Sequence, residues 1–164
     1  MSHRSKRAPW AALLLVAAVA VLAIAQDESD ATLVLNEIEI NPNGLDHGNE
    51  WVEILNLSES SVDLAGWSIS YTYRGPGTWP LVDSPRTLGP GERFVFVYPR
   101  IALRNAEANV IRLIDPAGWI VDESSPLLDK DDDDSTWQRF PDGGDPWFPD
   151  LWILNAATRG RSND

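Results

Sequence analysis

The fold of this chain is decided by one stretch, which reads Gly48-Asn49-Glu50-Trp51-Val52-Glu53-Ile54-Leu55-Asn56 and, after a serine-rich turn, Val62-Asp63-Leu64-Ala65-Gly66-Trp67-Ser68-Ile69. In an extended chain alternate side chains point to opposite faces, so Val52 and Ile54 share one face of the first half. Trp67 and Ile69 share one face of the second half, with the small polar Ser68 between them. This period of two predicts two half-buried strands joined by a polar turn over 57–61.

The rest of the chain contains further short apolar segments separated by turn residues. Strands are expected at 32–40, 93–98, 110–114, 119–122 and 137–140, with a hairpin turn over 115–118. Four prolines predict a loop over 74–91, because proline cannot donate to a β-ladder. The segment 93–98 is apolar on both faces, which predicts a central strand. These patterns indicate an all-β, antiparallel β-sandwich, with a core made of Val52, Ile54, Trp67, Ile69, Val95 and Val97.

The N-terminus has the composition of an export segment. Arg4, Lys6 and Arg7 precede an uncharged run over 8–26, and Ala23-Ile24-Ala25 has the small-residue pattern of a cleavage site. Cleavage after Ala25 would leave 139 residues. The alternative is a retained membrane anchor, because a run of 19 uncharged residues is near the lower limit for crossing a bilayer. In both cases the rest of the chain is expected outside the cytoplasmic membrane. The expected organisation is a signal peptide or anchor helix over 1–25, a linker over 26–31 and one domain over 32–164.

The charge and the cysteine count exclude several classes of function. The formal net charge of −12 would become −15 without the three basic residues of the export segment. A surface with this much negative charge repels phosphate backbones, and no nucleic-acid partner is therefore expected. Membrane contact is expected only through an uncleaved N-terminal segment. The chain has no cysteine, which excludes disulfides, thiolate nucleophiles and cysteine metal sites.

Several motifs resemble, in the same order, those of the lamin-tail domain family. They are Asn36-Glu37-Ile38, the two halves of the stretch quoted above, Leu88-Gly89-Pro90-Gly91-Glu92, and 135–143. The residues that match the family motif are Asn36, Glu37, Gly48, Asn49, Glu50, Trp51, Glu53, Asn56, Asp63, Leu64, Gly66 and Trp67. The resemblance extends from Thr32 to Asn163 and implies an immunoglobulin-like sandwich of the prokaryotic extracytoplasmic type. It departs at Thr158-Arg159-Gly160, where the family often has Thr-Pro-Gly.

An acidic run over 129–134 offers the only weak metal candidates. Asp129, Asp131 and Asp133 have the alternate spacing with which a calcium loop begins. The later positions do not fit, because Asp134 stands where glycine is needed and Phe140 where a bidentate glutamate is needed. A solvated loop explains the run more simply and is the favoured interpretation, so no cofactor is predicted and only weak calcium binding is kept as an alternative.

Catalysis is not expected. Glu37, Glu50 and Glu53 could form the carboxylate pair of a glycosidase, but they lie on predicted strands, where bonding to backbone amides or arginines is the expected role. His47 is the one histidine after the export segment, and no Gly-x-Ser-x-Gly motif is present. A divalent-metal-assisted hydrolase stays an alternative only if the aspartates of 129–134 and these glutamates converge on one ion.

Tryptophan is unusually frequent, with eight in the chain. Trp51, Trp67, Trp119 and Trp137 fall on predicted strands, whereas Trp79, Trp147 and Trp152 fall among prolines and glycines, where exposure is expected. Exposed indole rings suit sugar or protein recognition. The sequence therefore predicts a non-catalytic, extracytoplasmic binding or scaffolding module, whose partner is a protein or an envelope polymer. A carbohydrate-binding module that uses Trp79, Trp147 or Trp152 is the alternative.

Overall fold

A computed structural model describes residues 33–144 and 151–164. The predicted export or anchor helix over 1–25, the linker over 26–31 and Trp147 lie outside these residues. Eleven strands make up the regular structure of the described residues, with these bounds: β1 Leu33–Glu39, β2 Trp51–Asn56, β3 Val62–Asp63, β4 Ser68–Tyr71, β5 Gly77–Pro80, β6 Thr87–Leu88, β7 Arg93–Val97, β8 Arg112–Ile114, β9 Ile120–Glu123, β10 Ser135–Arg139 and β11 Trp152–Ala156. No helix in the described part of the chain is long and apolar enough to cross a membrane.

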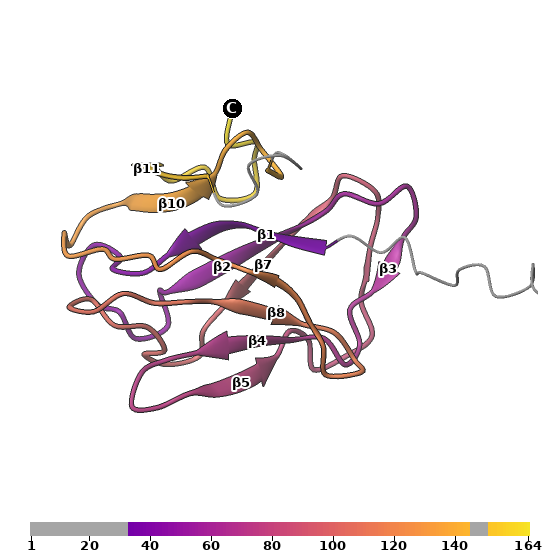
Figure 1. Cartoon of the computed structure of the whole chain (residues 1–164), viewed down its shortest axis with the longest axis horizontal. Helices are drawn as coiled ribbons and strands as arrows, with labels where there is room; N and C mark the ends of the chain where they lie inside the picture. The colour runs from indigo at the N-terminus through magenta and orange to yellow at the C-terminus, as the bar shows by residue number, and fades with distance from the viewer. Residues whose placement is uncertain (1–32, 145–150) are drawn as a thin grey trace, which may run out of the picture.

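The strands form two main antiparallel sheets that pack face to face, which confirms the predicted sandwich. The five-stranded sheet has the order β11-β10-β1-β2-β7, and the four-stranded sheet has the order β5-β4-β8-β9. Figure 1 shows β4 and β5 below β1 and β2. Buried side chains of both sheets make up one core. Strands β3 and β6 form a small separate pair at one end.

The core between the sheets contains most of the aliphatic residues expected there. Val52, Ile54 and Ile69 are fully buried, and Trp67 is 6 % exposed. Tyr98 is also fully buried, and its hydroxyl donates a 2.6 Å hydrogen bond to the carbonyl of Ser70. Strand β2 is buried on both faces, so it is more deeply enclosed than its alternating pattern indicated.

The predicted place and orientation of β7 are wrong. This strand pairs only with β2 and lies at the edge of its sheet, not at the centre. Phe94 lies opposite Ile54 in the register and is 8 % exposed, whereas Val97 is 36 % exposed and Val95 lies opposite Glu53. Residues that face each other across a ladder point to the same side of the sheet. The core therefore receives Phe94 and Phe96 in place of Val95 and Val97.

Two further segments differ from the sequence-based assignment. The predicted loop over 74–91 contains β5 and β6, and β5 accommodates Pro80 because it is an edge strand. Strand β11 follows β10, although 137–140 was expected to be the last well-paired strand. The predicted hairpin is confirmed by β8 and β9, whose turn is closed by the hydrogen bond from Gly118 N to Asp115 O.

Candidate functional site

The glutamates of the 48–56 stretch and of β1 are buried within the domain. Glu37, Glu50 and Glu53 are all 0 % exposed. The carboxylate of Glu50 accepts hydrogen bonds from the backbone N–H groups of Ala102 (2.6 Å) and Leu103 (3.1 Å). The pKa of Glu50 is raised to about 7, mainly by burial, and this value includes the opposite, lowering effect of the two amide hydrogen bonds. Glu50 therefore anchors the irregular segment that follows β7.

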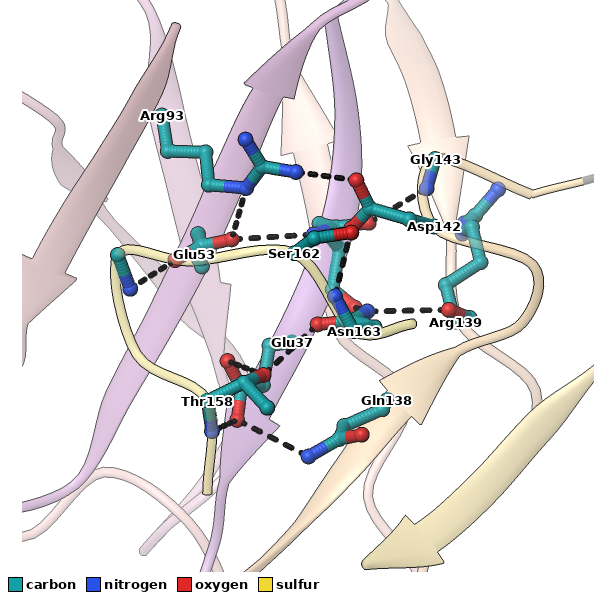
Figure 2. Close-up of polar contacts among 12 residues, drawn as sticks. Glu37, Glu53, Arg93, Gln138, Arg139, Asp142, Gly143, Thr158, Ser162 and Asn163 are labelled. Carbon is teal, nitrogen blue, oxygen red and sulfur yellow. Dashed lines mark hydrogen bonds and ion pairs between the residues drawn. The ribbon is translucent and has the colours of Figure 1, made fainter. Parts of the chain in front are cut away.

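Glu37 and Glu53 bind the C-terminal segment 157–164, which we call the tail. The backbone N–H of Thr158 donates to Glu37 at 2.7 Å, and the backbone N–H of Gly160 donates to Glu53 at 2.6 Å. Arg93 of β7 pairs with Glu53 at 3.2 Å. Figure 2 shows the tail passing over these side chains on the outer face of β1 and β2.

Asn163 completes the attachment of the tail. Its side-chain amide donates to the carbonyls of Asn36 and Arg139, both at 3.0 Å, which joins the tail to β1 and β10. Asp142 accepts a hydrogen bond from the Asn36 side chain and pairs with Arg93 (Figure 2). The glutamates of this network are thus occupied by backbone amides and an arginine, which is the role expected of them.

A solvent-accessible groove lies elsewhere, between the β4–β5 hairpin and the segment after β7. One cavity of about 470 Å³ is lined by His47, Tyr71, Tyr73, Arg74, Gly75, Pro76, Trp79, Arg100 and Ile101. A second cavity of about 420 Å³ shares Tyr73, Arg74 and Ile101 with the first and is also lined by Asp46 and Arg104. Because the two cavities share residues, they form one extended depression, which we call the arginine groove.

Aromatic rings hold the two central arginines of this groove. The guanidinium of Arg100 lies 5.3 Å from the centre of the Trp79 ring, and that of Arg74 lies 5.2 Å from the centre of the Tyr73 ring. Neither arginine forms an ion pair with a carboxylate of residues 33–144 or 151–164. A guanidinium that stacks on a ring keeps its N–H edge free to bind a carboxylate or a phosphate in two-point geometry.

Comparison with protein-family models matched residues 26–127, more than half of the chain, to the Lamin Tail Domain. The chain belongs to the lamin tail domain family. Comparison with curated proteins and with solved structures gave no match. The family is one of immunoglobulin-like, non-enzymatic domains. The matched range includes Glu37, Glu50 and Glu53, whereas the tail that binds two of them lies beyond it.

The acidic run of this lamin tail domain does not bring together the three aspartates that were kept as weak calcium candidates. Asp129 is 2 % exposed, and its carboxylate accepts a 3.1 Å hydrogen bond from the backbone N–H of Asp131. Asp131 and Asp133 are exposed. Within the described residues, no group of three or more carboxylate or histidine side chains lies close enough together to hold a metal ion. The metal-assisted alternative required the aspartates of this run and the glutamates to converge, and the glutamates instead bind the tail and the segment after β7.

The tryptophans are only partly where they were expected. Trp152, expected to be exposed, is 8 % exposed, because β11 turns it toward Arg139 of β10. Trp79 belongs to β5 rather than to a loop; it is half-buried, and its ring contacts Tyr71 and Arg100. Trp119, expected on a strand, lies in the β8–β9 turn and is 72 % exposed. Of the two predicted binding aromatics that the structure describes, Trp79 lines the first of these cavities.

Sequence reasoning missed the arginines of the groove. Arg74 and Arg100 stand more than twenty residues apart in proline-containing loops, and no motif connects them. A usable signal was the local pairing of arginine with aromatic residues, as in Tyr73-Arg74-Gly75-Pro76. Arg74 also has a φ of 59°, an uncommon conformation for a residue other than glycine.

Proposed function

We propose that this lamin tail domain is a non-catalytic binding module that acts outside the cytoplasmic membrane, where its arginine groove binds the acidic groups of an envelope polysaccharide. The observation that carries the proposal is the pair of ring-stacked arginines, Arg74 and Arg100, which have no carboxylate partner among the described residues. Guanidinium groups in such a position bind carboxylates and phosphates selectively.

The charge distribution supports an anionic ligand. The whole chain carries a formal net charge of −12, yet Arg74, Arg100 and His47 meet in one cavity. Four of the other arginines, namely Arg93, Arg104, Arg112 and Arg139, are paired with carboxylates. Among the described residues, Arg74 and Arg100 have no ion-pair partner, although Asp46 and Glu107 line the adjoining cavity. These two arginines attract negative groups in a protein that repels them elsewhere.

The form of the groove favours a polymer with rings over a compact ion. The two cavities that share Tyr73 and Arg74 extend the depression along the surface. Tyr71, Tyr73 and Trp79 add aromatic surface, which sugar rings use in their contacts with proteins. An acidic polysaccharide satisfies the arginines with its carboxylates and the aromatic side chains with its sugar rings.

The proposal is tested by binding of the purified full chain to polygalacturonate, to a poly-glutamate peptide and to uncharged dextran. We expect binding to polygalacturonate alone, weakened by salt and lost in the double variant Arg74→Ala/Arg100→Ala. Arg112→Ala is the matched control, because Arg112 pairs with Glu123 outside the groove, and it should bind like the parent. Preference for poly-glutamate would replace the polysaccharide by an acidic protein segment. Binding that survives the double variant would remove the groove from the proposal.

A further inference from the structure

Two buried carboxylates at the far end of β1 have an oxygen that no protein group satisfies. Glu39 is 3 % exposed and Asp129 is 2 % exposed. Glu39 Oε1 and Asp129 Oδ2 have no hydrogen-bond partner among the described residues. Buried ionised groups are normally paired or bound to a metal, because an isolated charge in a protein interior costs several kcal/mol or more.

The loops around these carboxylates are held together and carry further oxygen atoms. The backbone N–H of Gly44 donates a 2.6 Å hydrogen bond to Asp132, and Pro42 pairs with Asp133 in a parallel bridge. A cavity of about 350 Å³ opens beside Glu39 and is also lined by Asn43, Asn49 and Asp134. The loop after β1 and the acidic run therefore form one oxygen-rich pocket.

Among the residues that the structure describes, no basic side chain neutralises the pair. Neither Glu39 nor Asp129 forms an ion pair with a lysine or arginine of the described residues. Arg159 lines the same cavity, but its guanidinium lies 5.2 Å from the centre of the Trp51 ring. Burial and the neighbouring Asp129 raise the pKa of Glu39 to about 8. The local excess of negative charge agrees with a missing positive partner.

We propose that Glu39 and Asp129 bind one calcium ion, which neutralises both buried carboxylates and joins the loop after β1 to the acidic run. Calcium accepts six to eight oxygen ligands in irregular geometry, so two carboxylates can be supplemented by amide or carbonyl oxygens and by water, whereas magnesium requires a near-ideal octahedron. Within the described residues, no set of three or more carboxylate or histidine side chains is placed to hold a metal ion, so the proposed site has two protein carboxylates and takes its remaining ligands from other oxygens. The site differs from the loop expected from Asp131 and Asp133, and it is independent of the arginine groove.

Thermal unfolding of the full chain at pH 7.5 tests this site, with 10 mM calcium compared against EDTA. A ligand that binds only the folded state raises the melting temperature by mass action, and we expect a rise of at least about 3 °C. Glu39→Gln and Asp129→Asn should each remove most of this rise. Asp131→Asn is the matched control: it removes the same charge from an exposed position of the same run, and it should keep the rise.

Terbium luminescence gives a second readout that does not depend on the stability of the variants. Trp51 lines the cavity beside Glu39, so a bound Tb³⁺ ion should be sensitised by indole excitation and displaced by calcium with a stoichiometry of one ion per chain. The proposal would be overturned if calcium did not raise the melting temperature of the parent and no displaceable terbium signal appeared. A proton shared by Glu39 and Asp129 would then be what neutralises the pair. An equal rise in Glu39→Gln and in the parent would place the calcium elsewhere.

Discussion

The backbone N–H of Gly160 donates a 2.6 Å hydrogen bond to the carboxylate of Glu53, a residue 107 positions earlier in the chain. This bond places the tail over the outer face of β2, next to the bond from Thr158 to Glu37 of β1. Charge-assisted bonds of this kind are strong, and a buried carboxylate that loses its donors is costly. The last eight residues are therefore part of the folded domain rather than an appendage to it.

Removal of the tail should destabilise the domain. Deletion of residues 158–164 leaves Glu37 and Glu53 without their backbone donors, and we expect the free energy of unfolding to fall by about 3–5 kcal/mol. Urea denaturation followed by tryptophan fluorescence measures this change. Arg161→Ala alters an exposed residue of the same segment and should change stability by less than about 0.5 kcal/mol. A truncated chain as stable as the parent would contradict the structural role of the tail.

Trp67→Ala should be equally damaging for a different reason. The indole of Trp67 is 6 % exposed and packs in the core, so its truncation leaves a large cavity and should cost about 3–5 kcal/mol. Trp119→Ala is the natural comparison, because Trp119 is 72 % exposed and should change stability by less than about 0.5 kcal/mol. Similar melting curves for Trp67→Ala and the parent would show that the core assignment is incorrect.

The stability of the domain should fall as pH rises from about 4.5 to 7. Burial raises the pKa of Glu50 from 4.5 to about 7 in the folded state, so between these values the folded chain holds a proton that the unfolded chain has released. Stability then decreases with increasing pH. The pKa of Glu53 is raised in the same direction, also mainly by burial.

Urea denaturation at a series of pH values from 5 to 7.5 measures this dependence. Glu50→Gln removes the titrating group and should flatten the slope, even though it also weakens the bonds to Ala102 and Leu103. Glu59→Gln, in the exposed turn after β2, should leave the slope as in the parent. A slope unchanged by Glu50→Gln would assign the effect to other groups.

Export is a separate prediction that depends only on the N-terminus. A fusion of residues 1–40 to a reporter active only after export should be active, because Arg4, Lys6 and Arg7 flank an uncharged run. A silent reporter would contradict export. Mass spectrometry of the N-terminus of the full chain would then distinguish cleavage after Ala25 from a retained anchor.

The sequence alone determined the class of the fold and several of its strands. Alternation at Val52 and Ile54, and at Trp67 and Ile69, placed four core residues correctly. The Asp115–Gly118 turn fixed the β8–β9 hairpin, because turn chemistry depends on neighbouring residues and is readable locally. The role of the buried glutamates as acceptors for backbone amides could also be predicted from their places on strands.

Only the tertiary structure decided which face of β7 is inside, since both of its faces are apolar and a period of two does not say which one meets the core. Pairing with β2 selected Phe94 over Val95. The tertiary structure also brought Thr158 to Glu37, Asp129 to the end of β1, and Arg74 to the same groove as Arg100. These partners are from 26 to 121 residues apart in the sequence. Local sequence patterns report the conformation of a single segment. The packing of distant segments against one another determines which charged side chains are paired inside the protein and which stay free to bind a ligand.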